Sequence, residues 1–157
     1  MSATPILINT HDTLRPIGAA VFTPKSPLSA LRLPLFASKV SAGFPSPAAD
    51  YVDKTLDLNE LLVQKPAATF FVRALGDSML GAGIHPNDIL VVDRSIEPVA
   101  GKIVICALNG ELTVKRLVFE NAQWKLKAEN SAYPDFILND DLELVVWGVV
   151  TNVIHPL

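Results

Sequence analysis

The sequence predicts a mainly β fold preceded by an extended N-terminal arm. Three observations support this prediction: short runs rich in β-branched and aromatic residues follow one another, tight-turn residues separate them, and no long segment has the periodicity of a helix. The 157 residues are enough for one compact domain and a tail. A domain of this size buries about two thirds of its unfolded surface, so it needs neither metal nor disulfide to fold.

Residues 1–39 are expected to form the extended arm, because prolines recur along them. Proline removes a backbone donor and fixes φ, so a long helix does not continue through it. The arm contains Pro5, Pro16, Pro24, Pro27 and Pro34. Residues 41–47 follow the arm and are rich in small residues and proline, which is typical of a flexible linker.

The remaining residues are expected to form successive strands of one sheet. Residues 57–64 fit a short turn or strand leading into the core, and residues 80–87 form a loop that contains glycine and proline. The pair Asn109-Gly110 is typical of a tight hairpin turn between two strands. The predicted strands are residues 69–72, 88–92, 102–108, 111–118, 124–128 and 142–154.

Charge and cysteine content argue against several classes of function. The net charge is −3 and the pI is about 5.5, whereas direct binding to nucleic acid needs clustered lysine and arginine. The single cysteine, Cys106, is expected to be a small buried hydrophobe, which fits a reducing cytoplasm. No apolar run reaches the roughly 18 residues of a membrane span, so no anchor is expected.

Ser78 is the candidate nucleophile of the chain. It follows the predicted strand at residues 69–72 and the strand-breaking pair Gly76-Asp77, so its hydroxyl is presented at a bend. Asp77 is expected to form the turn and not to act as a base. A serine nucleophile needs a base within hydrogen-bond reach, and otherwise Ser78 is an ordinary turn residue. His85 is one candidate base, although its surroundings favour a solvated loop.

Lys115 is the other candidate base. Strand alternation places it on the same, partly apolar face as Thr113 and Leu117. A solvated lysine is neutral in only about one molecule in 2,500 at pH 7, but burial lowers its pKa by up to about 3 to 5 units. The alternative is a lysine on the surface of the strand.

Several motifs in order resemble the LexA/UmuD family of self-cleaving Ser-Lys peptidases, in particular its UmuD-like branch. They are Gly-Asp-Ser-Met at residues 76–79, Gly-Ile at 83–84, the run at 88–93, Leu-Thr-Val-Lys at 112–115 and Asn-Ser-Ala-Tyr at 130–133. The likeness extends from residue 33 to residue 153, roughly three quarters of the chain. It implies the signal-peptidase-like β fold of that family.

The resemblance also implies the roles of individual residues. Ser78 would be the nucleophile and Lys115 the general base, and the bond cut would be Ala42-Gly43. Cleavage there divides the chain into an arm, residues 1–42, and a peptidase and polymerase-accessory domain, residues 43–157. The bend and the family together point to the backbone N–H groups of Asp77, Ser78 and Met79 as oxyanion donors.

The family further implies what the protein does in the cell. After self-cleavage stimulated by RecA filaments on single-stranded DNA, the processed homodimer would serve a Y-family, UmuC-like polymerase as an accessory subunit in the SOS response. No cofactor or metal is expected. The alternatives are a LexA-type repressor, which the proline-rich arm disfavours because it has no room for a helix-turn-helix domain, and a binding module that does not cleave.

Overall fold

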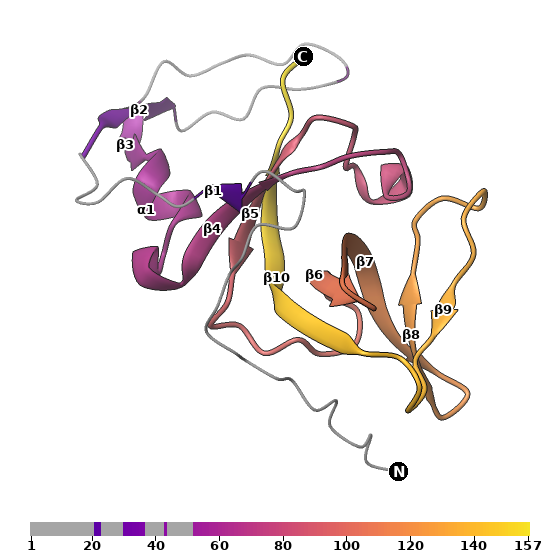
Figure 1. Ribbon diagram of the computed structural model, residues 1–157. Coiled ribbons are helices and arrows are strands. Elements are labelled where there is room, and N and C mark those ends of the chain that lie inside the picture. The colour runs from indigo at the N-terminus through magenta and orange to yellow at the C-terminus, as the bar shows by residue number, and fades with distance from the viewer. Residues whose placement is uncertain (1–20, 23–29, 37–42, 44–51) are drawn as a thin grey trace. The chain divides into compact units, whose positions relative to one another are not determined.

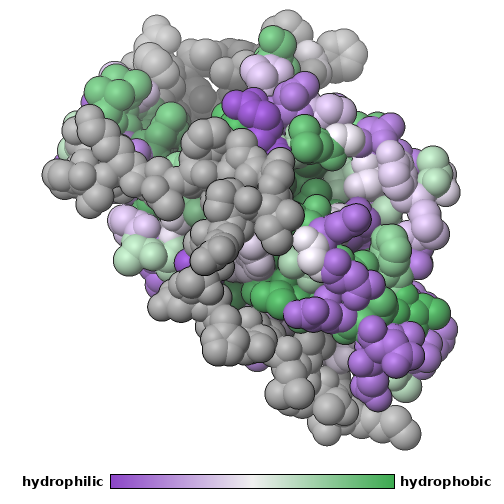
Figure 2. Space-filling view, viewed as in Figure 1, coloured by the Kyte–Doolittle hydropathy of each residue, from purple (hydrophilic) through white to green (hydrophobic). Residues whose placement is uncertain are grey.

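The computed structural model describes residues 21–22, 30–36, 43 and 52–157, and it divides the chain into two compact units. One unit comprises residues 25–64, and the other comprises residues 1–24 together with residues 65–157. No helix in the described part of the chain is long and apolar enough to cross a membrane. Among the residues drawn in colour in Figure 2, hydrophobic and hydrophilic patches adjoin one another on the face shown.

The smaller unit contains a two-stranded sheet and one short helix. Strand β2 (Arg32–Phe36) pairs antiparallel with β3 (Val52–Asp57), and α1 (Leu58–Leu62) follows directly. The expectation of a turn or strand across residues 57–64 is therefore wrong for most of that segment. The cause is Asp57, whose carboxylate accepts a hydrogen bond from the Asn59 backbone N–H at 2.8 Å and so caps the helix.

The larger unit is built on one antiparallel sheet of eight strands, so the predicted mainly β fold is confirmed (Figure 1). The order across the sheet is β1, β4, β5, β10, β6, β7, β8 and β9. The strands are β1 (Val21–Phe22), β4 (Thr69–Arg73), β5 (Ile89–Asp93), β6 (Ile103–Leu108), β7 (Glu111–Glu120), β8 (Gln123–Lys127), β9 (Phe136–Ile137) and β10 (Leu144–Ile154). Two 3₁₀ turns, η1 (Pro66–Ala68) and η2 (Leu80–Ala82), lie between strands.

All six strands predicted in this unit are present, with ends shifted by at most two residues. The hairpin of β6 and β7 turns at Asn109 and Gly110, whose φ angles are 49° and 83°. Both angles belong to the left-handed region, which asparagine and glycine tolerate best. Sequence patterns did not predict β1 and β9, because a strand of two residues has too little pattern to detect.

Strand β10 joins the two halves of the sheet. Its first part pairs with β6 and its second part with β5, and the register shifts near Gly148 and again near Thr151. A side chain at Gly148 would meet Val92 Cγ1 at 2.8 Å and the Asp93 carbonyl oxygen at 3.0 Å. Glycine therefore allows β10 to approach β5 closely while it bends, and Figure 1 shows that curvature.

The core consists of two clusters of buried side chains. The first contains Phe70, Val72, Ala74, Met79, Ile84, Leu90, Val92 and Ile105. The second contains Val104, Cys106, Leu117, Leu126, Val146 and Val149. Alternate residues of β6 enter different clusters, because successive side chains of a strand point to opposite faces. Cys106 is fully buried, as the sequence predicted.

Candidate active site

Ser78 lies in the turn between the end of β4 and η2. The chain leaves the sheet after Arg73, and Gly76 has a φ of 74°, a left-handed value that glycine adopts without strain. The base of this loop is closed by two hydrogen bonds, from Ala74 N to Asp88 O at 2.8 Å and from Asn87 N to Ala74 O at 2.9 Å. Ser78 is thus held above the sheet and remains partly exposed.

Lys115 lies in the middle of β7 with only 6% of its surface exposed. Val104 and Cys106 of β6 are the partners of Lys115 and Thr113 in the ladder, and Leu117 follows on the same face. These apolar neighbours belong to the second core cluster. The alternative of a surface lysine is therefore wrong.

The amine of Lys115 meets three oxygen atoms. Its Nζ lies 3.2 Å from Ser78 Oγ, 3.0 Å from Thr113 Oγ1 and 3.1 Å from the Val114 carbonyl oxygen. A neutral amine has two hydrogens and one lone pair. It can donate to Thr113 and Val114 and still accept the hydroxyl proton of Ser78.

Burial lowers the pKa of Lys115, and the charge that a Cys106 thiolate would carry acts in the opposite direction. Burial also raises the pKa of Cys106 to about 12, so this thiol is neutral near pH 7 and offers no counter-ion. None of the ion pairs among the described residues includes Lys115. The surroundings therefore favour the uncharged amine.

The backbone beside Ser78 offers hydrogen-bond donors. Within the described part of the chain, the N–H groups of Asp77, Ser78 and Met79 donate to no acceptor. The Asp77 carbonyl accepts a hydrogen bond from Asn130 Nδ2 at 2.9 Å. The same carbonyl accepts a longer hydrogen bond from Leu80 N at 3.4 Å. Because this carbonyl and the Ser78 N–H belong to one trans peptide and point in opposite directions, Asn130 contributes to where that N–H points.

A second contact ties the Asp77 side chain to the same segment. The Tyr133 hydroxyl donates to Asp77 Oδ1 at 2.5 Å, and this hydrogen bond is the main reason why the pKa of Tyr133 is raised. Asn130 Oδ1 in turn accepts from Ala132 N at 3.0 Å, which shapes the loop that carries the tyrosine. Asp77 is thus engaged in holding the turn, as predicted, and its side chain makes no hydrogen bond to the Ser78 hydroxyl in the part of the chain that the structure describes.

Backbone contacts hold the next turn of the chain against this loop. Gly81 N donates to the Glu129 carbonyl at 2.7 Å, and a side chain at Gly81 would approach that oxygen to 2.6 Å. Glu129 is also paired with Arg116 of β7. The segment 129–133 therefore holds the turn at Ser78 from both sides, through hydrogen bonds to Asp77 and Gly81.

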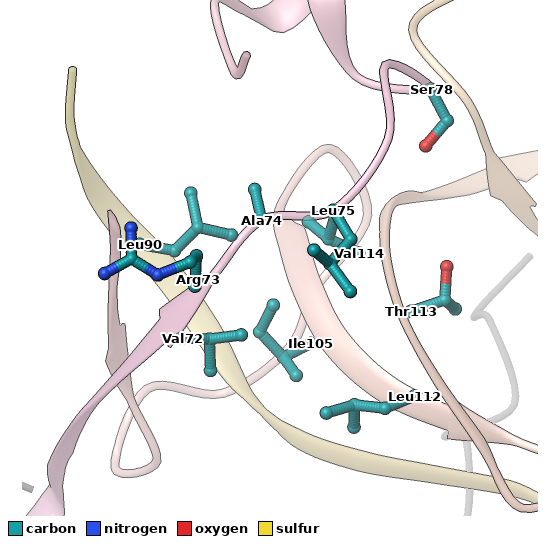
Figure 3. A pocket seen from close by; sticks show the side chains of 10 residues that line it. All are labelled: Val72, Arg73, Ala74, Leu75, Ser78, Leu90, Ile105, Leu112, Thr113 and Val114. Atoms are coloured by element: carbon teal, nitrogen blue, oxygen red, sulfur yellow. The ribbon is translucent and has the colours of Figure 1, made fainter. Parts of the chain in front are cut away.

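A groove leads to Ser78 (Figure 3). Its apolar lining is contributed by β4, β5, β6, β7 and the segment that follows β4, and the Ser78 and Thr113 hydroxyls face the same space at one end. The lining residues are Val72, Arg73, Ala74, Leu75, Ser78, Leu90, Ile105, Leu112, Thr113 and Val114. Such a groove can receive an extended peptide with small or apolar side chains next to the hydroxyl.

The other candidates from the sequence lie elsewhere or outside the description. The contacts of His85 among described residues are with Asp88 and His155, not with Ser78. Ala42 lies outside the described residues, and its neighbour Gly43 is exposed. The sequence did not predict a role for Asn130 or Tyr133, although both belong to a motif of the family resemblance. Their hydrogen bonds to Asp77 show that they hold the turn at Ser78.

Comparison with known proteins gives consistent matches over most of the chain. A family model described as peptidase S24-like matches residues 34–151. Protein SamA of Salmonella typhimurium is 50% identical over 122 residues, which cover 78% of this chain and 84% of SamA. Protein ImpA of Escherichia coli is 48% identical, covering 78% and 83% of the two chains. Protein MucA of Escherichia coli is 42% identical, covering 79% and 86%.

Proposed function

Since this chain belongs to the peptidase S24-like family, we propose that it is a self-cleaving serine peptidase with Ser78 as nucleophile and Lys115 as general base. The resemblance to the UmuD-like branch is confirmed by the relatives SamA, ImpA and MucA. The observation that supports the two roles is the 3.2 Å contact between Lys115 Nζ and Ser78 Oγ, made by a buried amine that has no acidic partner among the described residues.

The reaction begins with transfer of the Ser78 hydroxyl proton to the neutral Lys115 amine. The freed oxygen attacks the carbonyl carbon of Ala42, and the backbone N–H groups at the turn stabilise the oxyanion. The bond from Ala42 to Gly43 then breaks, and the Lys115 ammonium gives its proton to the departing Gly43 amine. Water, deprotonated by the same lysine, hydrolyses the ester on Ser78 and restores the hydroxyl.

Cleavage at this bond releases residues 1–42 and leaves residues 43–157 as the processed form. Two features of the sequence support the choice of bond: both residues are small, and residues 41–47 have the composition of a linker that can be bent into a groove. Because enzyme and substrate are one chain, proximity contributes several kcal/mol toward the barrier. Docking of the linker is then the step at which cleavage can be controlled.

The biological role is that of the UmuD-like proteins, accessory subunits of a translesion DNA polymerase in SOS mutagenesis. Members of the family form dimers, and we extend this to a homodimer that works with a Y-family, UmuC-like polymerase. Stimulation by RecA filaments on single-stranded DNA requires that the filament bind the docked linker better than the undocked one. The acidic balance of the chain favours action through these protein partners over direct contact with DNA.

The alternatives make different demands on the site. Among the described residues, the buried amine of Lys115 has no counter-ion, and such a group lowers the free energy of unfolding. A binding module that does not cleave would gain nothing from this cost. A LexA-type repressor would bind an operator as the uncut protein. A DNA mobility-shift assay on the uncut chain tests that second alternative.

The direct test follows the mass of the purified chain at alkaline pH, and in parallel with RecA, single-stranded DNA and an ATP analogue. We expect two fragments that join at Ala42-Gly43, and no cleavage in Ser78→Ala or Lys115→Ala. Lys115→Arg is expected to be inactive too, because a guanidinium does not release its proton near neutrality. Lys127→Ala is the matched control, because the Lys127 side chain on β8 is 43% exposed and is paired with Glu120. Cleavage at another bond, or undiminished cleavage in Lys115→Ala, contradicts the proposal.

A further inference from the structure

Two histidines and one aspartate meet at the far side of the loop that follows Ser78. His85 and Asp88 lie between η2 and β5, and His155 comes directly after β10. The pairing of Ile154 with Ile89 brings His155 beside this loop, although Asp88 and His155 are 67 residues apart in the chain. None of the three lines the groove at Ser78.

The three side chains converge on one carboxylate. Asp88 Oδ1 lies 2.5 Å from His155 Nδ1, and Asp88 Oδ2 lies 3.7 Å from His85 Nδ1. The backbone N–H of His85 also donates to Oδ2 at 2.7 Å, which fixes the orientation of the carboxylate. Each residue offers one ligand atom, and these three atoms all lie within 4.8 Å of one another.

Burial and charge at the cluster suit a cation. The Asp88 side chain is 1% exposed, whereas His85 and His155 are 47% and 39% exposed, so a carboxylate is held inside while the imidazoles open to solvent. Among the described residues, neither lysine nor arginine is paired to this carboxylate, so a bound cation would be its counter-ion.

The donor set selects the kind of metal. Two imidazole nitrogens and one carboxylate oxygen are typical ligands of zinc, while calcium and magnesium prefer sets made of oxygen alone. We propose that His85, Asp88 and His155 form a site for Zn²⁺, with water as the fourth ligand. Sequence patterns did not predict it, because His155 is 67 residues from Asp88 in the chain.

Binding requires only small adjustments. Ligand atoms around a tetrahedral zinc lie about 3.3 Å apart when each metal–ligand bond is about 2.0–2.1 Å. The contact of His155 with Asp88 is shorter than this, and that of His85 is longer. The two imidazole rings are stacked with centroids 4.4 Å apart and are half-exposed. They can therefore rotate until the distances from the two Nδ1 atoms to the Asp88 oxygens are similar. The bound ion would link the end of β10 to the loop between η2 and β5, which follows Ser78 in the chain.

The test measures Zn²⁺ binding to the full chain in the Ser78→Ala background, so that the protein stays uncut. Equilibrium dialysis is expected to give one Zn²⁺ per chain, and Co²⁺ is expected to give the visible absorption of a tetrahedral site. Removing a residue that only hydrogen-bonds a zinc ligand typically weakens zinc binding by about 10-fold to 100-fold. His85→Ala and His155→Ala each remove a ligand itself, so each should weaken Zn²⁺ binding by at least that much.

His11→Ala is the matched control, since it removes the third histidine of the chain and should leave Zn²⁺ binding unchanged. Asp88→Asn keeps the size of the buried side chain and should also weaken binding. Circular dichroism of each variant checks that it has folded. Absence of stoichiometric Zn²⁺ binding, equal binding in the His85 and His155 variants, or loss of binding in His11→Ala overturns the proposal. None of these readouts depends on self-cleavage.

Discussion

Asn130 offers a sharp test of how the turn at Ser78 is positioned. Its Nδ2 holds the Asp77 carbonyl at 2.9 Å, and the opposite side of that peptide carries the Ser78 N–H, one of the proposed oxyanion donors. Asn130→Asp is the informative change. The aspartate still accepts from Ala132 N, as Asn130 Oδ1 does, but it cannot donate to the Asp77 carbonyl and places a negative oxygen against it.

The size of the effect follows from two different costs. Losing a single neutral hydrogen bond lowers the free energy of unfolding by about 0.5–1.5 kcal/mol, which shifts the Tm by a few degrees in a domain of this size. Losing an oxyanion donor outright lowers a rate by about 10²–10³-fold. Since the Ser78 N–H is displaced and not removed, we expect self-cleavage to slow by about 10-fold to 100-fold while the protein remains folded.

The assay measures the rate of self-cleavage against pH for wild type and variant, with the Tm measured in parallel. A positioning role lowers the plateau rate, which is reached at pH values where Lys115 is neutral in both proteins, whereas the charge of the new carboxylate acts on the midpoint of the pH profile. Asn139→Asp is the matched control, since Asn139 Oδ1 only accepts from Asp141 N on an exposed turn. Wild-type rates in Asn130→Asp, or a loss explained by unfolding, would refute the reasoning.

Two further predictions concern Lys115. Because burial lowers the pKa of Lys115 in the folded chain, the rate of self-cleavage should rise with pH, and the midpoint of this rise should lie below about 10.4, the pKa of a free lysine. A midpoint at or above that value contradicts the role of Lys115 as a neutral base. Lys115→Met, made in Ser78→Ala, should raise the free energy of unfolding measured with urea. The unfolded chain binds a proton that the folded Lys115 releases, so wild-type stability increases as pH rises from the folded pKa to the unfolded pKa, and the advantage of methionine should shrink over that window. Lys102→Met, at an exposed lysine, should show no such change with pH.

Local patterns were sufficient for most of the sheet. The Asn109-Gly110 turn and the alternation of β7 depend on neighbours one to four residues away, and both were predicted correctly. Helix α1 was missed because its five residues are too few to show helical periodicity, although the Asp57 carboxylate caps its start by accepting a hydrogen bond from Asn59 N. The two-residue strands β1 and β9 exist only because a longer strand lies beside each of them.

The sequence by itself determined which groups are present and on which strand face each lies, including a lysine at position 115 and a serine at a bend. Only the tertiary structure decided that these two meet across 37 residues, that Asn130 reaches Asp77 across 53, and that His155 joins Asp88 across 67. The physical reason is that a pKa and a donor's direction depend on what surrounds a group in space. For Lys115 the surroundings are Val104, Cys106 and Leu117, whose packing removes the water that would otherwise keep the amine charged.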